Sequence, residues 1–220
     1  TEVLVHLYED RGDKMFRDLR GMYALCIYDR KDASLLMARD PFGEKPLYYW
    51  SRGEGLVFSS EVNSLLAYDA IPRRLDYEAL GYYLRASFVP APLTMFRDVR
   101  QIEPGCWMRW KDGVLSHGRH WDPDYTTSSQ LQDETVAQGL IEEALQRAVS
   151  RQMMSERPLG AFLSGGIDSS TIVAFAQSET SQPIKTFTVG FEESTYDESG
   201  IARLVAQSVE TDHHEYRVAN

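Results

Sequence analysis

Residues 158–170 constrain the fold of this chain more than any other stretch, because they predict a strand, a glycine turn and a helix in immediate succession. The apolar run at residues 159–163 predicts a buried strand, and a helical pattern begins at Asp168. Between them lie Ser164, Gly165 and Gly166. A turn of this kind directs several backbone N–H groups toward one point at a helix N-terminus, where the helix dipole also attracts anions.

The residues of this turn suit a phosphate group. Adjacent glycines let the backbone approach a phosphate closely, because no Cβ intervenes. Ser164, Ser169 and Ser170 can supply hydroxyl donors. Asp168 is placed to hold Mg²⁺ against the phosphates. The alternative is an ordinary strand-to-helix turn that is capped by serine. The turn lacks the lysine of a Walker A loop and the glycine spacing of a dinucleotide-binding fingerprint, so it predicts neither.

Two strings carry a resemblance to a known family: Leu-Ser-Gly-Gly-Ile-Asp-Ser-Ser at residues 163–170 and Thr-Phe-Thr-Val-Gly-Phe at residues 186–191. They resemble glutamine-dependent asparagine synthetases, whose synthetase domain is a PP-loop ATP-pyrophosphatase. The resemblance implies that ATP, with Mg²⁺, adenylates the side chain of L-aspartate and releases pyrophosphate. The ATP-binding residues that it implies are Leu163, Ser164, Gly165, Gly166, Asp168, Ser169, Ser170, Val189 and Gly190, with Asp168 also as the Mg²⁺ ligand.

A second resemblance lies in the first part of the chain. Its strings are Leu-Arg-Gly-Met-Tyr-Ala at residues 19–24, Ala-Arg-Asp-Pro-Phe-Gly-Glu-Lys-Pro-Leu-Tyr-Tyr at residues 38–49 and Phe-Ser-Ser-Glu-Val at residues 58–62. They look like the glutaminase domain of the same family, a four-layer sandwich of the N-terminal-nucleophile amidohydrolase class that releases ammonia from L-glutamine. The alternative for Arg39, Asp40 and Lys45 is that they are surface charges on a hairpin.

The family's glutaminases use an N-terminal cysteine as the nucleophile, and its own α-amino group is the base. Here residue 1 is Thr, and it begins a helical pattern. Cys26 lies in an apolar strand pattern and is predicted to be a small buried residue, and Cys106 is predicted to be structural as well. We therefore expect no glutaminase catalytic residue in this chain, and we expect the nucleophile to lie upstream of it.

The pattern of elements changes along the chain. Short strands with polar turns predict an α+β part, the C-terminal part of a glutaminase domain, at residues 1–122. Residues 123–133 are polar and predict a linker, and from residue 134 strands alternate with helices. This alternation predicts an α/β part, the first βαβ units of a parallel-sheet PP-loop domain related to the adenine nucleotide alpha hydrolases, at residues 134–220. The first helix there should pack through Val136, Leu140, Ala144, Leu145 and Val149.

Composition limits the classes of function. A formal charge of −10 argues against non-specific nucleic-acid binding, which needs a basic face. The sequence contains no apolar run long enough for a membrane span and no signal-peptide pattern. Only two cysteines are present, which favours a cytoplasmic setting over a disulfide framework. The chain does not begin with Met, and we expect it to be a piece of a longer protein, which the family resemblance implies is a homodimer.

Some interpretations remain open. His213 and His214 could suggest a metal site, but adjacent strand residues point to opposite faces, which favours structural roles. Tyr196, Asp197 and Glu198 either shape the nucleotide site or simply begin a surface helix. For the function, the alternatives to asparagine synthesis are a relative that amidates another carboxylate or closes a β-lactam ring, and a non-catalytic module or inert fragment.

Overall fold

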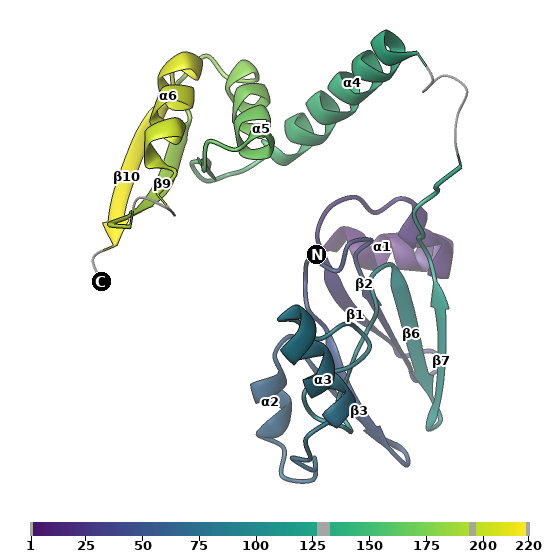
Figure 1. The fold of residues 1–220 in the computed structure, drawn as a ribbon. Coiled ribbons are helices and arrows are strands. Elements are labelled where there is room, and N and C mark those ends of the chain that lie inside the picture. Colours follow the sequence, from purple (N-terminus) through teal and green to yellow (C-terminus); the bar gives the residue numbers. More distant parts are fainter. Residues whose placement is uncertain (1, 127–132, 194–196, 219–220) are drawn as a thin grey trace. The chain divides into compact units, whose positions relative to one another are not determined.

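The structure is a computed structural model that describes residues 2–126, 133–193 and 197–218 (Figure 1). The chain divides into two compact units, Thr1–Tyr125 and Thr126–Asn220, and each unit has its own core. No helix in the described part of the chain is both long and apolar enough to cross a membrane.

The first unit consists of two antiparallel sheets flanked by helices. One sheet has the strand order β1-β2-β6-β7, and the other has the order β4-β3-β5. The elements are α1 Glu2–Arg11, the 3₁₀ helix η1 Gly12–Arg17, β1 Ala24–Asp29, β2 Ser34–Arg39, β3 Tyr48–Arg52, β4 Gly55–Ser59, α2 Val62–Leu66, α3 Tyr77–Ala86, β5 Arg100–Gln101, β6 Cys106–Lys111 and β7 Val114–Arg119. The β6–β7 turn has positive φ at both Asp112 and Gly113, a conformation that suits a two-residue hairpin.

Three apolar clusters hold these layers together. The first lies between α1 with η1 and the outer face of the four-stranded sheet, and it includes Met15 and Leu36. The second lies between the two sheets and includes Met37 and Met108. The third lies between the three-stranded sheet and α2 and includes Leu65. The layer sequence helix, sheet, sheet, helix confirms the predicted sandwich.

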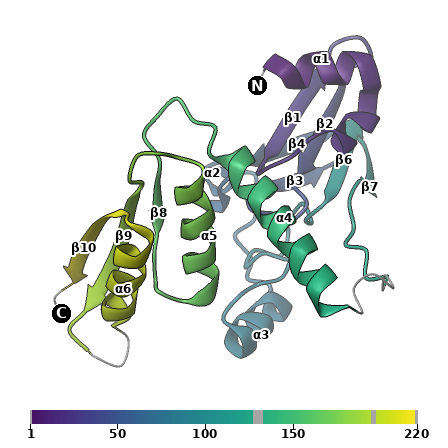
Figure 2. The same ribbon diagram turned by 90° about the horizontal axis from the view of Figure 1, so that it is seen from above.

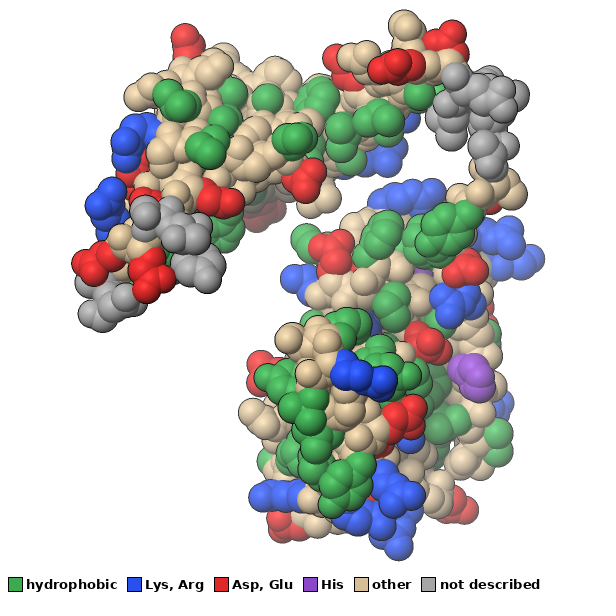
Figure 3. Space-filling view, viewed as in Figure 1, with side chains coloured by type: hydrophobic (Ala, Val, Ile, Leu, Met, Phe, Trp, Pro, Cys, Tyr) green, Lys and Arg blue, Asp and Glu red, His purple; other side chains and the backbone are tan. Residues whose placement is uncertain are grey.

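Asp76 determines where α3 begins. Its carboxylate accepts hydrogen bonds from the N–H groups of Glu78 at 3.0 Å and Ala79 at 3.2 Å, and so satisfies donors that have no partner within the helix. The same helix also carries exposed apolar side chains, which include Tyr77 and Leu84. Figure 3 shows hydrophobic side chains on the surface of this part of the first unit. Only part of the apolar surface of α3 is therefore packed.

The Asp76 cap leads to a first prediction. Asp76→Ala is expected to lower the free energy of unfolding by about 1 kcal/mol, because two N–H groups at the start of α3 lose their acceptor. Asp76→Asn keeps an acceptor oxygen and should recover most of the loss. Urea unfolding followed by tryptophan fluorescence measures this, since all four tryptophans of the chain lie in the first unit. An alanine variant as stable as the wild type would contradict the assignment of the cap.

The second unit is a parallel α/β sheet. Its elements are α4 Glu134–Gln152, β8 Gly160–Phe162, α5 Ile167–Ser178, β9 Lys185–Phe191, α6 Ser199–Val209 and β10 Asp212–Val218. The strand order is β10-β9-β8, and both pairings are parallel, as predicted. Figure 2 shows α5 and α6 beside the sheet, and their buried residues share one core with Leu163 and Ile184.

Three predictions of burial are wrong. The strand expected at residues 159–163 is shorter, and Phe162 is 82% exposed because it lies on the sheet face opposite the buried cluster, where its partner Phe187 is exposed as well. The face predicted for α4 is buried only at Val149, while Val136 and Leu140 are exposed, since the cluster that packs this helix meets only its last turns. Cys26 is exposed because β1 is an edge strand and the cluster between the sheets is built from the other strands.

Candidate functional site

The turn after β8 begins from a firmly held residue. Leu163 is only 1% exposed, and its N–H donates to the carbonyl of Phe187 at 2.9 Å. The Leu163 carbonyl in turn accepts a hydrogen bond from the hydroxyl of Thr188. Both polar backbone groups of Leu163 are thus bound to β9, so the position of the following turn is defined by that strand.

The turn itself is stabilised by two serines that lie on either side of the glycines. The hydroxyls of Ser164 and Ser169 are 2.9 Å apart, and the N–H of Ser164 donates to the Ser169 hydroxyl at 3.3 Å. Gly165 has φ +83°, which favours glycine, and a Cβ on it would lie 2.7 Å from the backbone nitrogen of Ala202 in α6. Glycine is therefore required at residue 165 both by the backbone conformation and by close packing.

The helix that follows has no side-chain cap. Gly166 is the N-cap residue of α5, and among the residues that the structure describes no side chain caps the N–H groups of the first turn. In the same unit, α4 is capped by Asp133, whose carboxylate accepts from Thr135 at 2.9 Å and from Val136 at 3.1 Å. The Ser164 hydroxyl accepts a hydrogen bond from the N–H of Gly166 at 3.4 Å, but Gly166 precedes the first turn of α5, so the serine cap that we considered does not cover the first-turn N–H groups. The open N-terminus of α5 can instead bind an anion.

The end of β9 lies beside this turn. Phe162 pairs with Phe187 in the parallel register, so Ser164 and Val189 leave the paired region at the same end of the sheet. The side chain of Val189 is exposed, and Gly190 is buried. Binding sites in parallel sheets lie at the carboxyl ends of the strands. The structure therefore brings the turn and the predicted adenosine-binding strand together.

Of two other residues predicted to bind ATP, Asp168 is exposed, whereas the hydroxyl of Ser170 is buried. Asp168 is exposed in the first turn of α5, where a carboxylate can reach a bound ligand from the solvent side. The hydroxyl oxygen of Ser170 is buried and has no hydrogen-bond partner among the residues that the structure describes. Because this oxygen is not accessible, Ser170 would have to change rotamer to contact a phosphate.

Asp197 supports the same end of the sheet, and Tyr196 lies outside the described residues. The Asp197 carboxylate accepts from the N–H of Ser199 at 3.1 Å, at the start of α6. Its hydrogen bonds with Ser199 lower the pKa of Asp197, and the positive charge of the nearby Arg217 lowers it further. A Cβ on Gly190 would lie 3.2 Å from the same carboxylate. Asp197 thus packs between the end of β9 and the beginning of α6.

The two adjacent histidines, His213 and His214, each contact a side chain of β9. Nδ1 of His213 lies 2.9 Å from the hydroxyl oxygen of Thr186, and the ring of His214 stacks on Phe187 with 5.3 Å between centroids. Within the part of the chain that the structure describes, no three His, Cys, Asp or Glu side chains are grouped as a metal site would need. These positions agree with structural roles for both rings.

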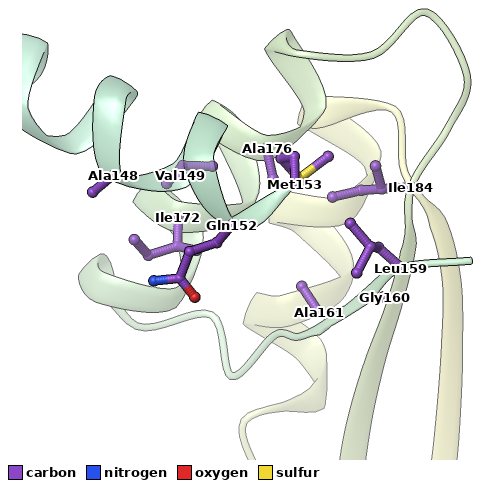
Figure 4. A pocket seen from close by; sticks show the side chains of 10 residues that line it. All are labelled: Ala148, Val149, Gln152, Met153, Leu159, Gly160, Ala161, Ile172, Ala176 and Ile184. Atoms are coloured by element: carbon purple, nitrogen blue, oxygen red, sulfur yellow. The ribbon is translucent and has the colours of Figure 1, made fainter. Parts of the chain in front are cut away.

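An apolar pocket of about 230 Å³ lies between α4, β8 and α5. Figure 4 shows the side chains of Met153, Leu159 and Ile184 around this space, with Gln152 at its rim. Its lining contains no charged residue and none of residues 162–171. The pocket is therefore distinct from the candidate phosphate-binding turn.

In the first unit, Arg39 and Asp40 are buried and are not surface charges. The Arg39 guanidinium donates to the carbonyls of Lys45 at 2.7 Å and Ile102 at 2.8 Å, and also to that of Gly43. Burial lowers the pKa of Arg39, but the guanidinium stays protonated, as it does in proteins generally. The side chain of Lys45 is exposed. Arg39 therefore fixes the segment that follows β2 and is not available to a ligand.

The Asp40 carboxylate complements this arrangement. It accepts hydrogen bonds from the N–H groups of Phe42, Glu44, Lys45 and Tyr23, at distances of 3.0–3.3 Å. Burial alone would raise the pKa of Asp40, but these four backbone donors together lower it below its ordinary value. Arg39 and Asp40 thus stabilise the turn that follows β2 through hydrogen bonds with backbone groups.

Neither cysteine is placed as a catalytic nucleophile. Cys26 lies in an edge strand, and Cys106 packs against the cluster between the sheets. Burial raises the pKa of Cys106, which keeps its thiol protonated at neutral pH. Thr1 lies outside the described residues, so the structure says nothing about the first residue.

The sequence analysis did not identify two contacts that hold the turn: the Thr188 hydroxyl on Leu163 and the packing of Gly165 on α6. No signal for the first was present in the sequence. Thr186 and Thr188 alternate with Phe187 and Val189, a pattern that predicts threonines on the solvent face, whereas in the structure the threonines are buried and the apolar residues are exposed. The second depends on a helix that follows far along the chain, and it has no local signal.

Comparisons with known proteins match both parts of the chain. A family model described as a glutamine amidotransferase domain matches residues 1–121, and one described as asparagine synthase matches residues 140–220. The chain is 37% identical over 211 residues to asparagine synthetase [glutamine-hydrolyzing] 1 of Bacillus subtilis (strain 168), covering 95% of this chain and 33% of that protein. It is 33% identical over 225 residues to putative asparagine synthetase [glutamine-hydrolyzing] 2 of Methanocaldococcus jannaschii, covering 98% of this chain and 42% of that protein.

The chain thus spans between a third and a half of the length of these two relatives. Among solved structures, glutamine phosphoribosylpyrophosphate amidotransferase from B. subtilis is similar at 16% identity with a TM-score of 0.37, covering 98% of this chain and 38% of that one. A likeness of that size carries no argument about this protein.

Proposed function

Because the chain belongs to the glutamine-dependent asparagine synthetase family, we propose that the complete protein makes asparagine from aspartate, with ATP and with ammonia from glutamine. The observation that carries the proposal is the uncapped N-terminus of α5, next to a glycine turn at the carboxyl end of β8. We assign residues 1–122 to the C-terminal part of the glutaminase domain, residues 123–133 to a linker, and residues 134–220 to the N-terminal part of the synthetase domain.

In this proposal, the turn holds the pyrophosphate part of ATP. The free N–H groups at the start of α5 and the hydroxyls of Ser164 and Ser169 donate to its oxygens, and Gly165 and Gly166 let the backbone approach. The exposed surface at Val189 and Gly190, with the backbone of Leu163, receives the adenosine. The residues present fit such a ligand, because the first-turn N–H groups of α5 lack a side-chain cap.

The reaction that this geometry suits is attack by the aspartate side-chain carboxylate on the α-phosphorus, with pyrophosphate as the leaving group. Ammonia then attacks the acyl carbon of the adenylate and displaces AMP. Donors fixed around the departing pyrophosphate stabilise the negative charge that develops there. Mg²⁺, when bound, neutralises phosphate charge, and Asp168 is the carboxylate of this chain that would hold it, with phosphate oxygens as further ligands.

The first unit contributes no catalytic residue in this proposal. In this proposal the first unit is the C-terminal part of the glutaminase domain, and Arg39 and Asp40 fix the turn that follows β2. The proposal further places the complete protein in the cytoplasm as a homodimer. Size-exclusion chromatography with light scattering tests the dimer, and a monomeric mass at micromolar concentration would contradict it.

The function is tested with the complete protein, ATP, Mg²⁺, L-aspartate and ammonium. We expect AMP and pyrophosphate to form in equal amounts with asparagine, and only when aspartate is present. Replacing ammonium by glutamine should support the same products if the glutaminase domain is active. AMP formation with a different carboxylate would reassign the acceptor, for example to a β-lactam-forming relative. ADP as the product, or no turnover of ATP with any acceptor, would refute the proposed site.

A further inference from the structure

Two threonines of β9 face the core of the second unit, and only one of them reaches the phosphate-binding turn. Thr186 is 0% exposed and Thr188 is 4% exposed. The Thr186 hydroxyl lies 2.8 Å from the hydroxyl of Thr211 and 2.9 Å from Nδ1 of His213, at the side of β10. The Thr188 hydroxyl instead donates to the Leu163 carbonyl, on the opposite side of the strand.

The Leu163 carbonyl lies where the main-chain pairing of β8 with β9 ends. The register runs from Gly160 to Phe162, and one further bond joins the Leu163 N–H to the Phe187 carbonyl. Beyond this point a side chain, and not the strand ladder, holds β8. The next residues, 164–166, form the turn, so any displacement of Leu163 is passed directly to the donors that face the ligand.

We propose that Thr188 is a positioning residue, whose hydroxyl fixes Leu163 and thereby holds the turn in the geometry that binds ATP. The inference rests on the proposed function of the turn. Both groups are buried, so water does not replace the hydroxyl when it is removed, and the carbonyl can regain a partner only by moving toward solvent. That movement carries Ser164 and the glycines with it.

The chain supplies a matched control for this proposal. Thr188→Val and Thr186→Val make the same change of shape and polarity on the same face of one strand, two residues apart. In the complete protein, Thr188→Val is expected to raise the KM for ATP about tenfold, the effect of one lost hydrogen bond, with the KM for aspartate changed less than about twofold. Thr186→Val should leave the KM for ATP within about twofold, although it also loses a buried hydrogen bond. Thr188→Ser restores the donor and should restore the KM for ATP.

Hydrogen exchange of the ligand-free protein provides a readout that is independent of activity. Amides of residues 163–169 should exchange faster in Thr188→Val, and at the wild-type rate in Thr186→Val and Thr188→Ser. Unchanged exchange in Thr188→Val, or equal effects of the two valine variants on the KM for ATP, would overturn the proposal. If the wild type turns over no ATP, the proposed function fails, and the exchange data alone decide whether Thr188 anchors the turn.

Discussion

Gly165→Ala is expected to reduce ATP-dependent AMP formation by the complete protein by about 100-fold, which is the scale of loss when reacting groups are displaced by about 1 Å. Gly165 has φ +83°, and a Cβ on it would lie 2.7 Å from the backbone nitrogen of Ala202. The backbone nitrogen belongs to α6 and cannot rotate away as a flexible side chain could. The turn must therefore move, and the donors at the start of α5 move with it.

Alanine variants of two other glycines, Gly166 and Gly200, serve as controls for the Gly165→Ala variant. Gly166 has negative φ, and the nearest atom to its added Cβ is the Ser164 hydroxyl oxygen at 3.5 Å, so Gly166→Ala should fold normally. Its Cβ stands where a phosphate approaches, so we expect a higher KM for ATP at unchanged stability. Gly200 lies in the first turn of α6 with no atom within 4 Å of an added Cβ, and Gly200→Ala should leave catalysis unchanged.

Steady-state rates of pyrophosphate release, together with thermal unfolding of each variant, provide the measurement. A Gly165→Ala variant that retains the wild-type KM for ATP and the wild-type rate would show that the ligand does not bind at this turn. Loss of activity in Gly200→Ala to the same degree would show that α6 is sensitive to any change, and that Gly165 has no special role.

From the sequence, the helices, strands and turns of this protein are predicted better than the burial of their side chains. Hairpins and helix starts depend on local chemistry, such as the Asp112 and Gly113 turn and the Asp76 cap, and these signals lie within a few residues of their effects. The parallel sheet also follows from the alternation of strand and helix patterns. Both features are therefore visible in one sequence.

Burial depends on neighbours that a local pattern does not reveal. Phe162 has the apolar context of a core strand, but it lies on the face of the sheet opposite the buried cluster, where Phe187 and Val189 of the central strand are exposed as well. Cys26 is exposed because the cluster between the sheets does not include residues of the edge strand β1. The bond from Thr188 to Leu163 joins residues that are 25 positions apart, so only the fold brings them together.

A family motif can indicate that residues matter without revealing what they do, and the Arg-Asp motif is an example. Its resemblance to a family indicates that Arg39 and Asp40 matter, and either a ligand contact or a hairpin surface would have suited two charged residues. The structure shows a third arrangement, in which both side chains satisfy backbone groups of one turn. Spacing along the sequence does not reveal this, because the partners include the Ile102 carbonyl, 63 residues away.

Asp40→Asn is expected to lower the free energy of unfolding of the first unit by about 3–5 kcal/mol, the largest loss of stability that we predict. Asp40 is 1% exposed, and each of its two carboxylate oxygens accepts hydrogen bonds from two backbone N–H groups. An amide has a single oxygen, so its NH₂ group would face two of those donors. The buried N–H groups would then lack an acceptor.

The effect should depend on pH in a defined direction. The pKa of Asp40 in the folded protein is below its ordinary value, so the ionised carboxylate stabilises the fold above the unfolded-state pKa of about 4. This contribution is lost as the pH falls through the folded-state pKa. The difference in stability between the wild type and Asp40→Asn should therefore be constant from pH 5 to pH 7 and should shrink below about pH 4.

Urea unfolding followed by tryptophan fluorescence reports the first unit alone, because Trp50, Trp107, Trp110 and Trp121 all lie within it. Asp10→Asn is the matched control, since Asp10 is exposed at the end of α1, and the same change there should alter stability by less than about 0.5 kcal/mol. Equal stabilities of Asp40→Asn and Asp10→Asn would refute the structural role of the carboxylate. A difference that grows toward low pH would refute the direction of the pKa shift, because an acceptor that is held ionised by four donors must lose its advantage once it is protonated.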